Sequence, residues 1–199
     1  MKISHEKKME NRRRILTAAV ELIGEKGLKT ATMRQIARQA GIGDATIYNY
    51  FPTKEAIVFG YYEDHVGDCI EALKAVPDFQ SFSLQEQIQT LFDTSLGLYL
   101  PDREFVARTF RKALQAGSGD WARLKPIRTR FLAAIGDMLA AAAEVGEIPD
   151  QVFEDLIGQF FMEAYMGVVI YWLEDRSHGF SNTSVLVDRG LDLACAMIK

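Results

Sequence analysis

The sequence contains few of the residues that stabilise secreted mini-proteins or mark membrane proteins. It has two cysteines, Cys69 and Cys195, in 199 residues, too few for a disulfide framework. The charged start of the chain is followed by no apolar segment, so no signal peptide is visible. The longest apolar run, 164–173, has about half of the ~20 residues that cross a bilayer. We therefore expect a cytoplasmic protein with no membrane span.

Proline is also sparse, and the stretches between the five prolines show helical rather than strand patterning. No segment combines strand-like alternation with turn residues. Apolar residues recur at helical spacing from about Arg12, and Gly27 stands where a helix would end. Cap signals at Thr53 and at the Ser83–Glu86 box mark later helix starts. With 48% hydrophobic and 25% charged residues, these patterns predict an all-α globular protein of about nine helices.

The net charge of −4 conceals an asymmetry between the two ends of the chain. Residues 1–60 carry a net charge of +5, and residues 61–199 carry −9. A basic front section before an acidic body suits a protein whose one end meets a polyanion. A solvated charge run is the alternative explanation.

Residues 32–51, TMRQIARQAGIGDATIYNYF, have the construction of a helix-turn-helix. Thr32 can cap a helix over 33–40, Gly41-Ile42-Gly43 can turn the chain, and 44–50 can form a second short helix. One apolar set would hold the two helices together: Ile36, Ala37, Ala40, Ile42, Ile47 and Phe51. The second helix is then free to enter a DNA major groove.

This stretch resembles the signature of the tetracycline-repressor (TetR) family of bacterial transcription regulators. The resemblance rests on Thr32, Ile36-Ala37, 40–43, 45–48, Tyr50-Phe51 and Lys54-Glu55, and it covers roughly residues 10–58. It implies a DNA-binding domain over residues 1–53 and a helical effector-binding and dimerising domain over residues 54–199. The function it implies is sequence-specific regulation, as a repressor released from a palindromic operator by a small molecule.

The resemblance also assigns DNA contacts residue by residue. Ala45, Thr46 and Tyr48 would meet base edges or a thymine methyl group, and the phosphate contacts would come from Thr32, Arg34, Asn49, Tyr50 and Lys54. Packing against neighbouring helices is the alternative for Tyr48 and Tyr50. We interpret Asp44 first as the N-cap of the recognition helix and second as an acceptor from a cytosine amine.

An effector pocket is expected inside the body, although each candidate can also be ordinary core. The candidates combine aromatic, thioether and hydroxyl side chains: Tyr61, Tyr62, His65, Val66, Cys69, Phe92, Ser95, Leu96, Tyr99, Phe110, Trp121, Phe131, Met162, Tyr165 and Met166. A palindromic operator requires a homodimer. Surplus apolar residues near the end predict its interface: Phe153, Leu156, Ile157, Phe160, Val168, Trp172, Val185, Leu186, Leu193 and Met197, with Arg189 beside them.

Other site types have weaker support in the sequence. His65 and Cys69 share a helical face with zinc-ligand spacing, but a third ligand is missing, so we expect neither a metal nor a cofactor. No phosphate-binding lysine loop or serine elbow is present, and no nucleophile or base can be named for an enzyme. The rival hypothesis is an all-α small-molecule binder or enzyme whose front domain contacts proteins.

Overall fold

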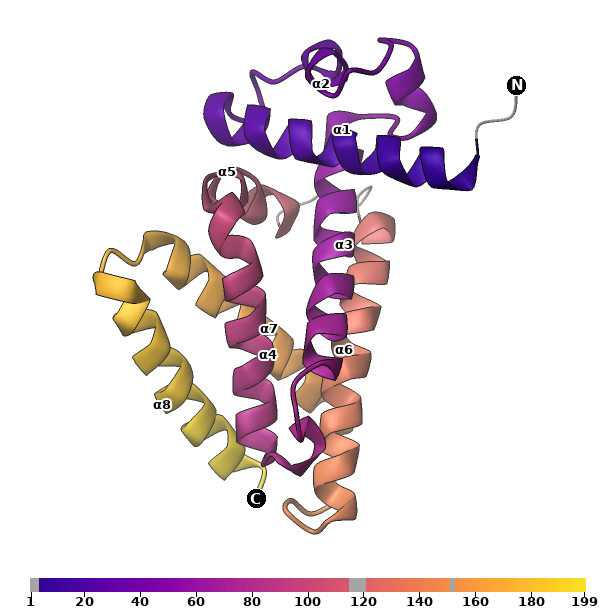
Figure 1. The fold of residues 1–199 in the computed structure, drawn as a ribbon. Helices are drawn as coiled ribbons and strands as arrows, with labels where there is room; N and C mark the ends of the chain where they lie inside the picture. Colours follow the sequence, from indigo (N-terminus) through magenta and orange to yellow (C-terminus); the bar gives the residue numbers. More distant parts are fainter. Residues whose placement is uncertain (1–3, 115–120, 151–152) are drawn as a thin grey trace. The chain divides into compact units, whose positions relative to one another are not determined.

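The computed structural model describes residues 4–114, 121–150 and 153–199, apart from the side chains of Leu114, Trp121 and Ala122. Over these residues the chain forms helices and no strand, which confirms the all-α class. The helices are α1 (His5–Lys26), α2 (Met33–Gln39), α3 (Lys54–Lys74), α4 (Leu84–Tyr99), α5 (Arg103–Leu114), α6 (Trp121–Glu144), α7 (Glu154–Glu174) and α8 (Ser181–Met197) (Figure 1). Four short 3-10 helices join them: η1 (Thr46–Asn49), η2 (Phe79–Ser81), η3 (Leu100–Asp102) and η4 (His178–Phe180). The described part therefore has eight α-helices rather than about nine.

The predicted helix starts at Thr53 and Ser83 are confirmed by their caps. The Thr53 hydroxyl accepts from the Ala56 amide at 3.1 Å, and Ser83 and Glu86 cap each other reciprocally. The first helix differs, because it begins at His5 rather than near Arg12. Ser4 caps this additional stretch, whose residues are mostly charged and exposed. Apolar periodicity gave no signal for it.

The chain divides into two compact units, and all three boundaries fall inside helices. Unit 1 comprises Met1–Asp64 and Tyr99–Leu124, and unit 2 comprises His65–Leu98 and Lys125–Lys199. Unit 1 thus holds α1, α2, η1, the first half of α3, and α5. Unit 2 holds the second half of α3, α4, most of α6, α7 and α8. The predicted boundary between a DNA-binding domain (1–53) and an effector-binding domain (54–199) separates functions, whereas these units are separated by how the chain packs. That domain boundary therefore stays a prediction.

In unit 1, α1 packs against both α2 and α5. The α1 residues Ile15, Ala19 and Ile23 are fully buried. The Arg108 guanidinium on α5 donates to the Gly24 carbonyl at 2.7 Å. The Tyr62 and Thr109 hydroxyls share a buried hydrogen bond of 2.7 Å, which ties α3 to α5. Unit 1 is therefore larger than the helix-turn-helix alone.

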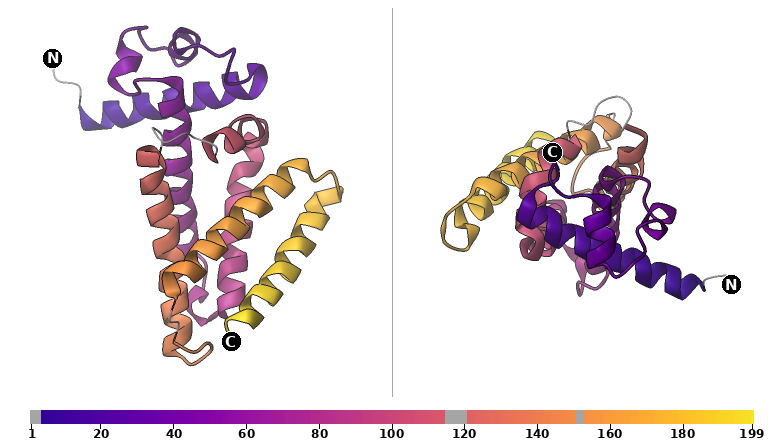
Figure 2. Two further views of the ribbon diagram at one scale, coloured as in Figure 1. Left: turned by 180° about the vertical axis from the view of Figure 1, so that it is seen from behind. Right: turned by 90° about the horizontal axis from the view of Figure 1, so that it is seen from above.

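In unit 2, α7 and α8 run in opposite directions and are joined by a short connection (Figures 1 and 2). Asp175 organises that connection, because its carboxylate accepts from the amides and hydroxyls of both Ser177 and Thr183. Helix α7 is the one described helix long and apolar enough to cross a membrane by length and composition. It packs on α8, and residues such as Val169 and Trp172 are buried, as in a core helix.

Candidate functional site

The helix-turn-helix is built from α2, a glycine turn and η1. Gly41 takes a positive φ of 63°, and the Ile42 amide donates to the Ala37 carbonyl at 2.9 Å, which closes the turn after α2. Ile36 and Ile47 are fully buried and hold the two segments together. The prediction of a helix over 44–50 is wrong in extent, because the described segment is the four-residue 3-10 helix η1.

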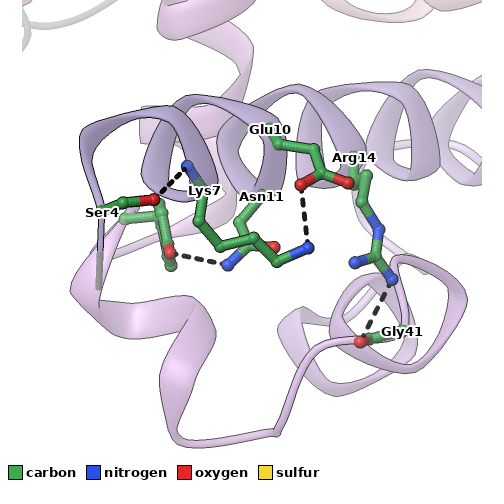
Figure 3. Close-up of polar contacts among 7 residues, drawn as sticks. Ser4, Lys7, Glu10, Asn11, Arg14 and Gly41 are labelled. Atoms are coloured by element: carbon green, nitrogen blue, oxygen red, sulfur yellow. Dashed lines mark hydrogen bonds and ion pairs between the residues drawn. The ribbon is translucent and has the colours of Figure 1, made fainter. Parts of the chain in front are cut away.

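Helix α1 supports this motif through polar contacts to the glycine turn and to Tyr50. The Arg14 guanidinium reaches from α1 to the Gly41 carbonyl at 3.3 Å (Figure 3). The Asn11 side-chain amide donates to the Tyr50 hydroxyl at 2.9 Å, and Tyr50 is half-buried. The packing role considered for Tyr50 is thus visible in the structure, while its phosphate contact stays a prediction.

The segment Ala45–Asn49 presents its polar surface to solvent. Ala45, Tyr48 and Asn49 are exposed, with 54% of Tyr48 accessible, and Thr46 is half-buried. Ile47 between them is the buried anchor. A short exposed segment fixed by one buried side chain can follow a groove and bring hydroxyl and amide groups to base edges. Their base contacts stay predictions.

Two residues assigned to phosphates also stabilise the motif. Thr32 forms a capping box with Gln35, because its hydroxyl accepts from the Gln35 amide at 3.3 Å and its own amide donates to the Gln35 side chain at 3.0 Å. The Lys54 ammonium donates to the carbonyls of Lys29 at 3.2 Å and Ala31 at 3.1 Å. An ammonium has three hydrogens, so Lys54 retains one for a phosphate.

Arg34 and Asp44 form an ion pair across the turn. The Arg34 Nε donates to Asp44 Oδ2 at 2.7 Å, and both side chains are largely exposed. Asp44 therefore does not cap the recognition segment: the N-cap of η1 is Ala45, which makes no side-chain cap. The N-cap interpretation of Asp44 is wrong, because the carboxylate turns towards the guanidinium instead.

Unit 2 contains a small internal cavity of about 10 Å³ bounded by four helices. Its lining residues are His65, Val66, Cys69 and Ile70 from α3, Leu91 and Ser95 from α4, Phe131 and Ala134 from α6, and Tyr165 from α7. This volume holds about one water molecule. Ile70 and Ala134 also line a larger open groove of about 490 Å³ that reaches to Phe79 and Met138. The two hollows are therefore adjacent.

A chain of three buried polar groups ties the cavity walls together. The His65 Nε2 and Ser95 Oγ lie 2.7 Å apart, and the Ser95 hydroxyl bonds the Tyr165 hydroxyl. Burial lowers the pKa of His65 from 6.5 to about 3, so the imidazole is neutral near pH 7. Burial raises the pKa of the Cys69 thiol to about 12, so Cys69 is a neutral wall residue.

The structure places the predicted pocket residues in different surroundings. His65, Val66, Cys69, Ser95, Phe131 and Tyr165 line the cavity, and Phe92 packs against Tyr165 at a tilted angle with ring centroids 5.2 Å apart. Tyr61, Tyr62, Tyr99 and Phe110 instead form an aromatic cluster in unit 1 with Phe105. Leu96 and Met162 are buried and Met166 is half-buried, outside the lining set, and Trp121 lies outside the described side chains.

Sequence reasoning missed three lining residues, Ile70, Leu91 and Ala134. Each lies three or four positions from a predicted lining residue, namely Val66, Ser95 and Phe131, and so shares its helical face. That spacing was the signal that could have found them. A pocket role for the whole set stays a prediction.

The predicted dimer residues also divide in the structure. Phe153, Leu156, Phe160, Val185, Leu186, Leu193 and Met197 are exposed, as is Arg189. Ile157 is half-buried, whereas Val168 and Trp172 are buried and belong to the core of unit 2. Tyr171 is a further exposed aromatic residue on α7 that sequence reasoning did not select.

Among the described residues no group of three His, Cys, Asp or Glu side chains is placed to hold a metal.

Two family models cover most of the chain. The model described as "Bacterial regulatory proteins, tetR family" matches residues 15–60, and "Tetracyclin repressor-like, C-terminal domain" matches residues 87–199. The chain belongs to the TetR family. It is accordingly a DNA-binding transcriptional regulator, and TetR regulators bind DNA and small-molecule ligands and act as dimers.

Individual TetR proteins are similar over most of their length. The Fatty acid metabolism regulator protein of Bacillus subtilis is 25% identical over 80% of this chain and 81% of its own length. The structure of FadR from Bacillus subtilis in complex with stearoyl-CoA has a TM-score of 0.77 at 24% identity, covering 94% of this chain and 99% of that one. Thermus thermophilus FadR in complex with lauroyl-CoA has a TM-score of 0.66 at 20% identity, covering 88% and 92%. At these identities the solved structures show the fold alone.

Proposed function

We propose that this TetR protein is a cytoplasmic repressor that binds an inverted-repeat operator as a homodimer and releases it when a small molecule binds in unit 2. The observation that carries the DNA-binding part is the exposed segment Ala45–Asn49 anchored by buried Ile47. The proposed phosphate contacts come from Thr32, Arg34, Asn49, Tyr50 and Lys54. Two such segments in a dimer read two half-sites about one helical turn apart.

For the effector we propose the acyl-CoA class. Two structurally similar regulators are described in complex with stearoyl-CoA and lauroyl-CoA, and a relative at 25% identity is named a fatty acid metabolism regulator. The lining of the unit 2 cavity is mostly apolar and adjoins the open groove through Ile70 and Ala134, which suits an alkyl chain. Because the cavity itself holds about one water, an alkyl chain enters only if α3, α4, α6 and α7 separate.

The first test is selection of bound duplexes from a random DNA library at near-physiological salt, followed by fluorescence anisotropy on the enriched sequence. We expect one inverted repeat, and we expect Tyr48→Ala to lose discrimination between that repeat and random DNA while remaining dimeric. A folded wild-type protein that enriches no sequence contradicts the DNA-binding proposal and favours the binder or enzyme alternative.

The second test titrates stearoyl-CoA or lauroyl-CoA into the protein–operator complex, with CoA alone as the control. We expect release of the operator, and by linkage the operator must weaken acyl-CoA binding by the same factor, typically about 5- to 150-fold. Acyl-CoA affinity that is unchanged by saturating operator contradicts the effector proposal and leaves the operator-binding result intact.

A further inference from the structure

Three cationic side chains around the recognition segment make contacts within unit 1. Arg14 donates to one backbone carbonyl, and Lys54 donates to two. Because these carbonyls are neutral, Arg14 and Lys54 each keep a full positive charge that can attract a phosphate. Arg34 is different, because its partner is the Asp44 carboxylate at 2.7 Å, which cancels its charge. Arg34 lies in the first turn of α2 and Asp44 directly precedes Ala45, the N-cap of η1, so the pair links the two segments of the helix-turn-helix.

The position and exposure of the pair place it in competition with DNA. The side chains of Arg34 and Asp44 are 76% and 49% exposed, so a phosphate can reach the guanidinium. A carboxylate and a phosphate present oxygen acceptors of the same kind to a guanidinium. The Asp44 carboxylate accepts from Arg34 Nε, so a phosphate that uses this nitrogen must displace Asp44. A phosphate that uses the terminal nitrogens instead lies beside the carboxylate, and in both cases the Asp44 charge faces a polyanion. An exposed ion pair is weak enough to be exchanged in this way.

We infer that Asp44 is an internal competitor of the DNA phosphates for Arg34, and that it lowers the sequence-independent affinity of the protein for DNA. The inference rests on the proposed DNA-binding function and deepens it. Affinity for random DNA comes almost entirely from cations that release condensed counterions. When Arg34 is held by the Asp44 carboxylate, about one cation–phosphate contact is lost from every non-specific complex. Asp44 thus lowers DNA affinity through its ion pair with Arg34 and makes no DNA contact of its own in this role.

A double-mutant cycle tests the inference with four proteins: wild type, Asp44→Asn, Arg34→Gln and the combined variant. Each is titrated against a labelled random-sequence duplex between 50 and 200 mM salt. We expect Asp44→Asn to bind about two- to fivefold more tightly and to steepen the log–log salt slope by about one. We also expect Arg34→Gln to weaken binding more in the Asp44→Asn protein, where the guanidinium is released, than in the wild type.

The opposite sign of coupling identifies the alternative role. If Asp44 orients Arg34 on a phosphate, Asp44→Asn weakens binding and Arg34→Gln has its larger effect in the wild type. That result overturns the inference, as does strict additivity. Glu21→Gln is the matched control, because it removes the same charge from unit 1 at a carboxylate that accepts from Gln39. An equal gain in Glu21→Gln assigns the effect to net charge and also overturns the inference.

Failure of the inference and failure of the proposed function give different results. A wild-type protein that binds its selected operator but shows no coupling overturns the inference alone. A wild-type protein that binds neither an operator nor random DNA overturns both.

Discussion

At the scale of single residues, Asp175 shows how one carboxylate can fix the connection between two helices. It is buried and accepts from the Thr183 hydroxyl at 2.7 Å, the Ser177 hydroxyl at 2.7 Å, and both backbone amides. The hydrogen bond from the Thr183 side chain is the largest cause that lowers the Asp175 pKa far below its ordinary value of 3.8, and burial opposes it. Folding therefore favours the ionised form of Asp175.

The pH dependence of stability follows from the direction of this shift. A carboxylate whose pKa is lower in the folded state stabilises the fold above its unfolded pKa, and this contribution is lost as pH falls towards the folded value. We expect Asp175→Asn to lower the melting temperature at pH 7 and the difference from wild type to shrink below about pH 4. Thermal melts at several pH values measure this, with the exposed Asp137→Asn as control. A gap between the two proteins that is constant with pH would contradict the argument.

Gly60 is a residue whose lack of a side chain allows Phe51 to pack closely against α3. A Cβ atom at this position of α3 would lie 2.8 Å from Phe51 Cε1 and 3.4 Å from an Arg12 nitrogen. Phe51 is buried and cannot move away easily. We expect Gly60→Ala to lower the free energy of unfolding by about 1–3 kcal/mol, as measured by urea denaturation.

Gly97 on α4 provides the matched control, because a Cβ there meets nothing within 4 Å. Gly97→Ala should raise stability by about 0.5–1 kcal/mol through lower chain entropy. If the two substitutions had the same effect, the contact with Phe51 would not be the cause.

At the scale of helices, sequence reasoning succeeded where local chemistry determines the outcome. The caps at Thr32, Thr53 and Ser83 and the positive φ of Gly27 were all predictable, because each depends on residues a few positions apart. It failed where a distant partner decides. Asp44 had the composition of an N-cap, but Arg34, ten residues away, captured its carboxylate.

The cavity residues also divide into those that local sequence determines and those that depend on distant packing. The helical faces of α3, α4, α6 and α7 were predictable from periodicity. The grouping of Tyr61, Tyr62, Tyr99 and Phe110 with α5 in unit 1 was not, because it depends on which helices pack together.

The His65–Ser95–Tyr165 chain joins α3, α4 and α7 around the unit 2 cavity. Ser95 is the central member, so its removal leaves the His65 nitrogen and the Tyr165 hydroxyl each without that partner in a buried site. We expect Ser95→Ala to lower the free energy of unfolding by about 1–3 kcal/mol. Thr90→Ala is the control on the same helix, since the exposed Thr90 hydroxyl donates to the Glu86 carbonyl of its own turn. A loss no larger than that of Thr90→Ala would show that the chain contributes little.

At the scale of the whole molecule, the exposed apolar residues of α7 and α8 require a partner surface. Phe153, Leu156, Leu193 and Met197 are each more than 60% accessible in the single chain. Large apolar side chains exposed on one helix pair in this way mark an interaction site. We propose a second copy of the same chain as the partner, because a C₂ interface uses one patch twice and a palindromic operator needs two recognition segments.

Combining Leu156→Glu with Leu193→Glu should therefore produce a folded monomer. Burying two carboxylates on each side of a symmetric interface is strongly unfavourable, whereas on the free helices they remain in water. We expect light scattering to show a monomer, circular dichroism to show unchanged helix content, and operator affinity to fall by about 10²-fold or more because the two half-sites are no longer bound together. Leu100→Glu, an exposed leucine of unit 1, should stay dimeric. A dimer that survives both substitutions would place the interface on another surface, and the half-site spacing would then have to be derived from that surface.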